Sequence, residues 1–214
     1  MSNRAVSTQI SMYFLWILAT SVGWFSGIFD LTDSIARTYL EIVRLIPLYL
    51  AEGLLIGMVI GIGQMLILRR IMPKASPWFW ATLLGYALAF PTGLLVTVLI
   101  PSIAFPLQGM HFLPLAGPST MTIYLFPDSL FWGGFMVGIL QWQVLKQIVP
   151  NPNLKKAALW IFASWLGFGL GILARGWVWD FHLPELEMGI MGLLIGLVTG
   201  LALLILIGKP ESAR

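Results

Sequence analysis

The chain has 214 residues, of which 58% are hydrophobic and only 10% are charged, and its net charge is +3. Because a soluble domain carries about 25% charged residues, this composition excludes an ordinary soluble surface and indicates a membrane protein. The small basic excess forms no basic run, which argues against nucleic-acid binding, and the lack of cysteine excludes disulfides and cysteine-ligated metals.

Six apolar stretches of about 20 residues, the length that crosses a bilayer core about 30 Å thick, divide the chain. They cover residues 9–29, 46–68, 77–102, 129–149, 157–179 and 187–208. The sequence therefore predicts an all-α membrane protein with six transmembrane helices in a single transmembrane domain over 1–214. Pro91 lies inside the third stretch and predicts a kink there, because proline lacks the backbone N–H.

Basic residues are unequally distributed between the two sides of the predicted bundle. Nine of the 12 precede the first stretch or follow the second, fourth and sixth: Arg4, Arg69, Arg70, Lys74, Lys146, Lys155, Lys156, Lys209 and Arg214. Arg37, Arg44 and Arg175 lie on the opposite side. Since Lys and Arg accumulate in cytoplasmic segments, we predict that the N- and C-termini are both cytoplasmic.

Two connections on the opposite side are themselves partly apolar. Residues 33–44 alternate apolar and charged side chains at three- and four-residue spacing, which is typical of a helix that lies flat in the headgroup region. Residues 103–127 form a long apolar segment with several prolines, and we predict an interfacial or re-entrant cap there.

Two short phrases alternate along the chain. The phrase Trp-x2-Ala-(Thr or Ser)-x2-Gly opens the first, third and fifth stretches, at Trp16, Trp78 and Trp160. The phrase Gly-x3-Gly-x2-Gln lies in the second and fourth stretches, and a weaker form in the sixth ends on Leu203 instead of Gln. This alternation predicts three tandem helical hairpins, over approximately 9–76, 77–156 and 157–208.

The small residues of both phrases share one helix face at 100° per residue, so we interpret them as seams where helices pack closely. The predicted seam residues are Gly23, Gly57, Gly61, Gln64, Gly85, Gly134, Gly138, Gln141 and Gly167. The two glutamines are expected to hydrogen-bond between helices. Their alternative role is coordination of a polar substrate or a pigment metal.

Both histidines of the chain lie in connections on the side opposite the basic residues. With nearby carboxylates they give candidate outer-loop contacts at His111, Asp180, His182 and Glu185. Imidazole and carboxylate groups this close could bind zinc or manganese, but their spacing matches no standard metal motif. We therefore prefer a solvated acidic loop that contacts a partner or a ligand.

The phrase Gly-x3-Gly-x2-Gln-Trp-x2-Leu-Lys, from Gly134 to Lys146, occurs together with Trp-x2-Ala-Ser-x2-Gly, from Trp160 to Gly167. This combination resembles a repeat of uncharacterised bacterial integral membrane proteins, many of them from photosynthetic lineages. The resemblance covers most of the six stretches and departs at Leu203. It implies a bacterial inner membrane or a thylakoid membrane, and it implies no activity or cofactor.

Common catalytic motifs, such as Gly-x-Ser-x-Gly, His-Glu-x2-His and the Walker loop, do not occur in the sequence. We expect a non-catalytic membrane component that binds membrane lipid, a pigment, or a membrane protein complex or oligomer. The alternative is a small-solute transporter or substrate-binding membrane subunit, because internal repeats and glycine-interrupted helices are also common in transporters.

Overall fold

The structure is a computed structural model of the chain, and it describes residues 3–26, 42–104, 118–178 and 184–207. Helices account for almost all of these residues, and no strand occurs among them. They are α1 (Asn3–Ser26), α2 (Ile42–Leu68), α3 (Ser76–Ala104), α5 (Pro118–Leu145), α6 (Leu154–Val178) and α7 (Pro184–Ile207). The predicted all-α class is confirmed for this part of the chain, and each helix contains most of one predicted apolar stretch.

Three helices extend into segments for which the sequence predicted interfacial structure, and α3 does so by its last two residues, 103–104. Residues 42–44 form the first turn of α2, and residues 118–127 form the first turns of α5. Pro118 suits this start, since a proline at the first helical position loses no helical hydrogen bond. Inside a membrane a continuous helix also pairs more backbone groups than an irregular cap does. The remainder of the two predicted segments, 33–41 and 105–117, lies outside the described residues.

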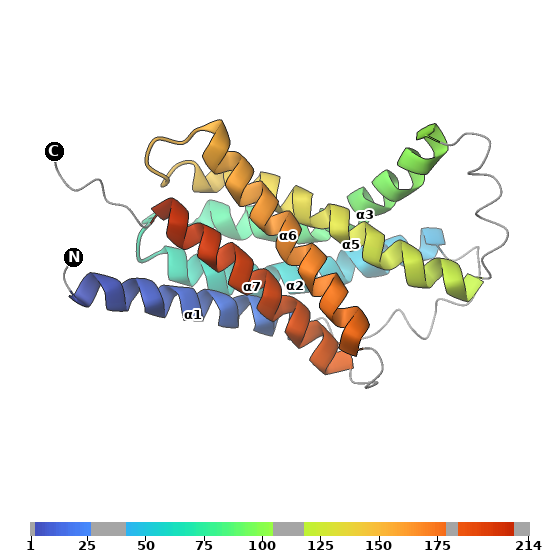
Figure 1. The fold of residues 1–214 in the computed structure, drawn as a ribbon, viewed down its shortest axis with the longest axis horizontal. Helices are drawn as coiled ribbons and strands as arrows, with labels where there is room; N and C mark the ends of the chain where they lie inside the picture. Colours follow the sequence, from blue (N-terminus) through green and yellow to red (C-terminus); the bar gives the residue numbers. More distant parts are fainter. Residues whose placement is uncertain (1–2, 27–41, 105–117, 179–183, 208–214) are drawn as a thin grey trace.

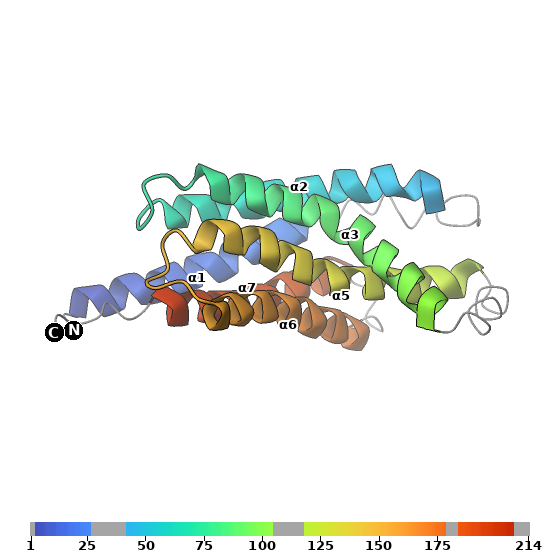
Figure 2. The ribbon, with the colours of Figure 1, turned by 90° about the horizontal axis from the view of Figure 1, so that it is seen from above.

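The six helices form a closed ring. Each helix packs against the next one along the chain, and α7 returns to pack against α1. The first turn of α1, the last turn of α7 and the short connections 69–75 and 146–153 all lie at one end of the bundle (Figures 1 and 2). We call this the connection end.

Helix α3 changes direction along its length, as Figure 2 shows. It nevertheless continues from Ser76 to Ala104 without interruption. We attribute the bend to Pro91, because sharp bends in helices commonly occur at proline, whose nitrogen cannot donate the helical hydrogen bond. The outer part of α3 thereby leans away from α2.

The distribution of apolar side chains is the reverse of that in a soluble protein. Every helix exposes large apolar residues to the outside, for example Phe14 at 64%, Trp80 at 58% and Leu173 at 66%. On α2 these residues recur every fourth position, at Leu54, Met58, Ile62 and Leu66. An apolar outer surface of this extent needs an apolar surrounding.

Three helical segments in the described residues have the length and hydropathy of a membrane span, namely Leu50–Leu68, Leu154–Ala174 and Leu186–Ile207. A shorter apolar helical segment runs from Phe131 to Leu145. These features are consistent with a protein embedded in a membrane. They identify α2, α6 and α7 as helices able to cross it.

Candidate functional site

The interior of the bundle contains a layer of polar side chains, one from each described helix. All of them are at most 5% exposed: Thr20, Gln64, Thr82, Gln141, Ser164 and Thr199. We call this set the polar layer. A buried polar group needs a hydrogen-bond partner, so the partners of these side chains determine how the helices are held together.

Gln64 connects three helices. Its Nε2 donates a hydrogen bond of 3.1 Å to Oγ1 of Thr20 on α1, and its Oε1 accepts one of 3.1 Å from Nε1 of Trp78 on α3. The hydroxyl of Thr20 donates in turn to the carbonyl oxygen of Trp16 at 2.9 Å. Gln64 thus hydrogen-bonds to side chains of both α1 and α3.

Gln141 makes a corresponding bond within the second hairpin, where its Nε2 donates to Oγ1 of Thr82 at 3.1 Å. The residue that corresponds to Trp78 at the next interface is Trp160. Its Nε1 is buried and has no hydrogen-bond partner among the described residues. Gln141 thus bridges α5 to α3, while the bridge from α5 to the indole of α6 is not formed.

The third interface, between α7 and α1, uses a threonine. Nε1 of Trp16 donates to Oγ1 of Thr199 at 3.1 Å, and the Thr199 hydroxyl donates to the carbonyl oxygen of Ile195 at 2.7 Å. Thr199 therefore accepts a hydrogen bond from the indole of Trp16, as Gln64 does from the indole of Trp78 at the first interface. The sequence had aligned Leu203 with the two glutamines, and this alignment is wrong by four residues.

The packing of the two helices within a hairpin gives the same correction of the alignment. A Cβ placed on Gly85 would lie 3.1 Å from the Cα of Val137, and one on Gly167 would lie 3.1 Å from the Cα of Ile195. Val137 precedes Gln141 by four residues, and Ile195 precedes Thr199 by the same number. The phrase in α7 thus begins one helical turn earlier than predicted. Leu203 instead corresponds to two buried leucines, Leu68 and Leu145.

The glycines of the two phrases lie where neighbouring helices approach closely. A Cβ on Gly57 would lie 3.0 Å from the Cα of Leu83, and one on Gly138 would lie 3.0 Å from the Cα of Ile161. A Cβ at any other predicted seam glycine would lie within 3.2 Å of a neighbouring helix: Gly23, Gly61, Gly85, Gly134 and Gly167. Side chains larger than hydrogen have little room at these positions.

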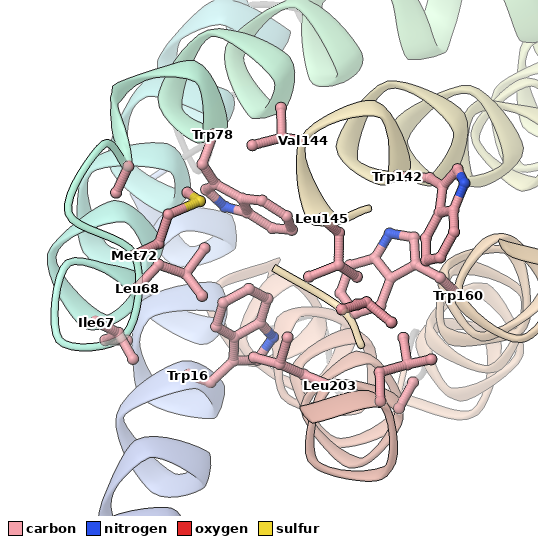
Figure 3. Packing of buried hydrophobic residues seen from close by; sticks show 14 of the residues in the cluster. Trp16, Ile67, Leu68, Met72, Trp78, Trp142, Val144, Leu145, Trp160 and Leu203 are labelled. Atoms are coloured by element: carbon pink, nitrogen blue, oxygen red, sulfur yellow. The ribbon is translucent and has the colours of Figure 1, made fainter. Parts of the chain in front are cut away.

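A layer of three tryptophans fills the bundle next to the polar layer. The rings of Trp16, Trp78 and Trp160 contact one another, with centroids 5.5, 5.8 and 6.3 Å apart, and none is more than 1% exposed. Figure 3 shows the three rings converging from α1, α3 and α6, with Leu145 and Leu203 beside them. We call Trp16, Trp78 and Trp160 the tryptophan layer.

A second aromatic layer lies on the other side of the polar layer. It consists of Trp24, Tyr86 and Phe168, whose ring centroids are 5.7 to 5.8 Å apart. Each of these residues follows a tryptophan of the first layer by eight positions, which is about 12 Å along a helix. We call them the mixed aromatic layer. Thr20, Thr82 and Ser164 of the polar layer fall halfway between, four positions after each tryptophan.

The candidate outer-loop contacts lie beyond what the structure describes. His111, Asp180 and His182 are outside the described residues, and Glu185 lies in the first turn of α7, where its side chain is not described. Glu187, two residues further, is buried at 5% exposure. Within the described residues, no group of three or more His, Cys, Asp or Glu residues is placed to hold a metal ion.

A cavity of about 280 Å³ opens between α1 and α7 at the connection end. Its lining includes Thr8, Met12 and Trp16 from α1, Leu204 and Ile207 from α7, and Ile71 from the first connection. We call it the α1/α7 cleft. The sequence did not indicate it, since the two helices are the farthest apart in the chain. The repeated phrases could have indicated that α1 and α7 meet as the other helices do.

No family model matches the chain, and no significant match was found among curated proteins or solved structures. The resemblance to bacterial membrane proteins that the motifs suggest therefore stays a prediction.

Proposed function

We propose that the protein is a non-catalytic integral membrane component with six spans, which binds a partner complex, lipid or pigment in a bacterial inner membrane or a thylakoid membrane. The observation that carries the proposal is the arrangement of the bundle: polar side chains bond to one another inside, aromatic layers close both sides of them, and apolar side chains face outward. Such an interior holds helices together, which is the role of a scaffold.

Spans by α1, α3 and α5 are supported by their outer faces. On α1, exposed apolar residues continue along one side through Ile10, Phe14, Leu18, Val22 and Phe25. α3 exposes Trp80, Leu84 and Leu88, and α5 exposes Phe135. Because each of these helices packs in the ring against at least one of the three that are long and apolar enough to cross a membrane, a common bilayer would solvate all six.

The basic residues support cytoplasmic placement of the connection end. Arg69, Arg70 and Lys74 on one connection and Lys146 on the other are exposed, and neither connection contains an acidic residue. Positive charge concentrated at one end of a helical membrane protein marks the cytoplasmic side. Both chain termini would then be cytoplasmic as well.

Descent of the hairpins from one repeated unit is supported by their equivalent contacts. In each hairpin the phrase glycine of the first helix meets a β-branched residue of the second, namely Ile60, Val137 and Ile195. In each case a polar-layer residue follows four positions later. A threefold repeat explains why three different segments of sequence pack alike.

Transport along the bundle axis receives less support than the scaffold function. A substrate route needs polar groups that a solute can reach, usually near the middle of the membrane. Here Gln64 and Gln141 use their amides on neighbouring helices, and the tryptophan layer and the mixed aromatic layer fill the interior on either side. A solute could pass only if both aromatic layers separated.

The partner is expected to contact the outer loops, where His111, Asp180, His182 and Glu185 gather in the sequence. The test is purification in a mild detergent, with identification of co-purifying protein, lipid and pigment by absorbance and mass spectrometry. The variant with all four residues replaced by alanine should lose a co-purifying partner and keep its melting temperature. An unchanged set of co-purifying molecules in this variant would contradict the role of these loops.

A further inference from the structure

The three interfaces between hairpins differ at the connection end. The α2/α3 and α5/α6 interfaces are each bridged by a short connection, whose apolar residues pack into the interior; Met72, Ala75 and Val149 are all buried. Helices α7 and α1 are not consecutive in the chain, so no short connection bridges them. The α1/α7 cleft lies at this interface, at the end where buried residues of a connection fill the other two interfaces.

Polarity changes along the α1/α7 cleft. Thr8 and Gln9 line it near the start of α1, whereas Met12 and the aromatic residues Tyr13 and Trp16 line it deeper in the bundle. Thr8 and Trp16 are eight residues apart, so the lining becomes apolar over a depth of about 12 Å. On α7 the lining from Gly200 to Ile207 is apolar throughout. A ligand that fits this gradient has a polar head and an apolar chain.

Two basic residues lie next to the cleft lining along the chain. Ile71 belongs to the lining, and the two residues before it, Arg69 and Arg70, are exposed. No acidic residue occurs in residues 1–26, 69–75 or 200–207, which supply the whole lining. Basic pockets between membrane helices on the cytoplasmic side are suited to the phosphate of a lipid headgroup.

From this geometry we propose that the α1/α7 cleft binds one anionic phospholipid. Its phosphate contacts Arg69 and Arg70, and one acyl chain extends past Met12 to the edge of Trp16. The lipid takes the place that a connection residue fills at the other two interfaces and so seals the ring between α7 and α1. This inference rests on the membrane location proposed above and specifies the lipid and its site.

The test compares phosphatidylglycerol with phosphatidylcholine carrying the same acyl chains, each added to delipidated protein in detergent and counted by native mass spectrometry. We expect tighter binding of phosphatidylglycerol. The Arg69→Gln, Arg70→Gln double variant should lose about 30-fold in affinity for it, at about fivefold for each basic residue near an anionic headgroup. The matched control is Lys146→Gln with Lys155→Gln, two exposed residues in the other connection and in the first turn of α6, and this double variant should bind like the original protein.

A second pair of variants tests the apolar part of the site. Ile207→Trp fills the cleft and should reduce lipid binding at least tenfold, whereas Ile205→Trp, at a position 58% exposed on the same helix, should leave it unchanged. If Ile207→Trp does not fold, a phosphatidylglycerol with a photoreactive acyl chain answers the same question in the original protein. Its crosslinks should fall on the first half of α1 and the last half of α7.

Three results would overturn the proposal: equal binding of the two lipids, equal loss in the two double variants, or crosslinks spread over all six helices. Competition by inorganic phosphate alone would identify an anion site without an acyl chain and would overturn it too. Retention of the protein in carbonate-washed membranes separates these failures from failure of the proposed function. A retained protein without lipid preference lacks this site but still has its membrane location.

Discussion

The residues of the polar layer differ in how many hydrogen bonds depend on them. Gln64 bonds to Thr20 and to Trp78, whereas Gln141 has its bond to Thr82. An interhelical hydrogen bond within a membrane contributes about 0.6 to 2 kcal/mol. We expect Gln64→Leu to lower the free energy of unfolding by about 1 to 3 kcal/mol and Gln141→Leu by about half as much, measured by unfolding in detergent.

Gln143 provides the control for these two variants, because it is exposed and bonds to the side chain of Lys146 at the surface. Gln143→Leu should leave the melting temperature unchanged. If Gln64→Leu or Gln141→Leu abolished partner or lipid binding while the melting temperature stayed the same, the glutamine would belong to a ligand site and its structural role would be refuted.

The corrected position of the third phrase also gives a prediction. If Leu203 corresponded to the glutamines, Leu203→Gln would restore a missing bridge and raise the melting temperature. Because Leu203 is instead buried beside the tryptophan layer, we expect Leu203→Gln to lower stability by about 2 kcal/mol, as an amide without a partner does. Thr199→Val, which removes the acceptor of the Trp16 indole, should lower it by about 1 kcal/mol. A stabilised Leu203→Gln protein would restore the original alignment.

At the scale of whole helices, stability depends on close backbone approach at the seams. A Cβ on Gly138 would already lie 3.0 Å from Ile161 and Ser164, so Gly138→Leu forces α5 and α6 apart. We expect a loss of about 3 kcal/mol, more than for either glutamine variant, because separated helices lose many contacts at once. The control is Ile62→Leu, which introduces the same side chain at an exposed position of α2. It should have no effect on thermal unfolding in detergent.

The helices themselves could be predicted because hydrophobic length alone determines where a chain can cross a bilayer. Their ends were less predictable. The first turns of α2 and α5 were assigned to interfacial segments because charges and prolines there resemble those of loops. The position of the phrase in α7 was not predictable because glycines at 192, 196 and 200 offer two equally spaced alternatives, and the partners on α1 and α6 distinguish them.

At the scale of the whole molecule, the closed ring brings together residues that no local pattern relates. The tryptophan layer repeats one residue type and could be seen in the sequence, although its three rings were not predicted to meet. The mixed aromatic layer uses three different residues, Trp24, Tyr86 and Phe168, so its repetition is hidden. The α1/α7 cleft depends on contact between the first and last described helices, which follows only from closure of the ring.

The orientation of this ring in the membrane gives the last prediction. Single cysteines can be introduced into the chain without interference, since it contains none. Lys155 is exposed at the connection end, and Glu185 lies beyond the far end of α6, which is long and apolar enough to cross a membrane. If the connection end is cytoplasmic, a membrane-impermeant maleimide added to intact cells should label the Glu185→Cys protein and not the Lys155→Cys protein. In permeabilised cells the maleimide should label both proteins, which shows that the cysteine of the Lys155→Cys protein is reactive.

The reverse pattern would place the basic connections outside, against the charge bias on which the orientation rests. Labelling of both positions in intact cells would mean that α6 does not separate them, and the six-span arrangement would then be wrong.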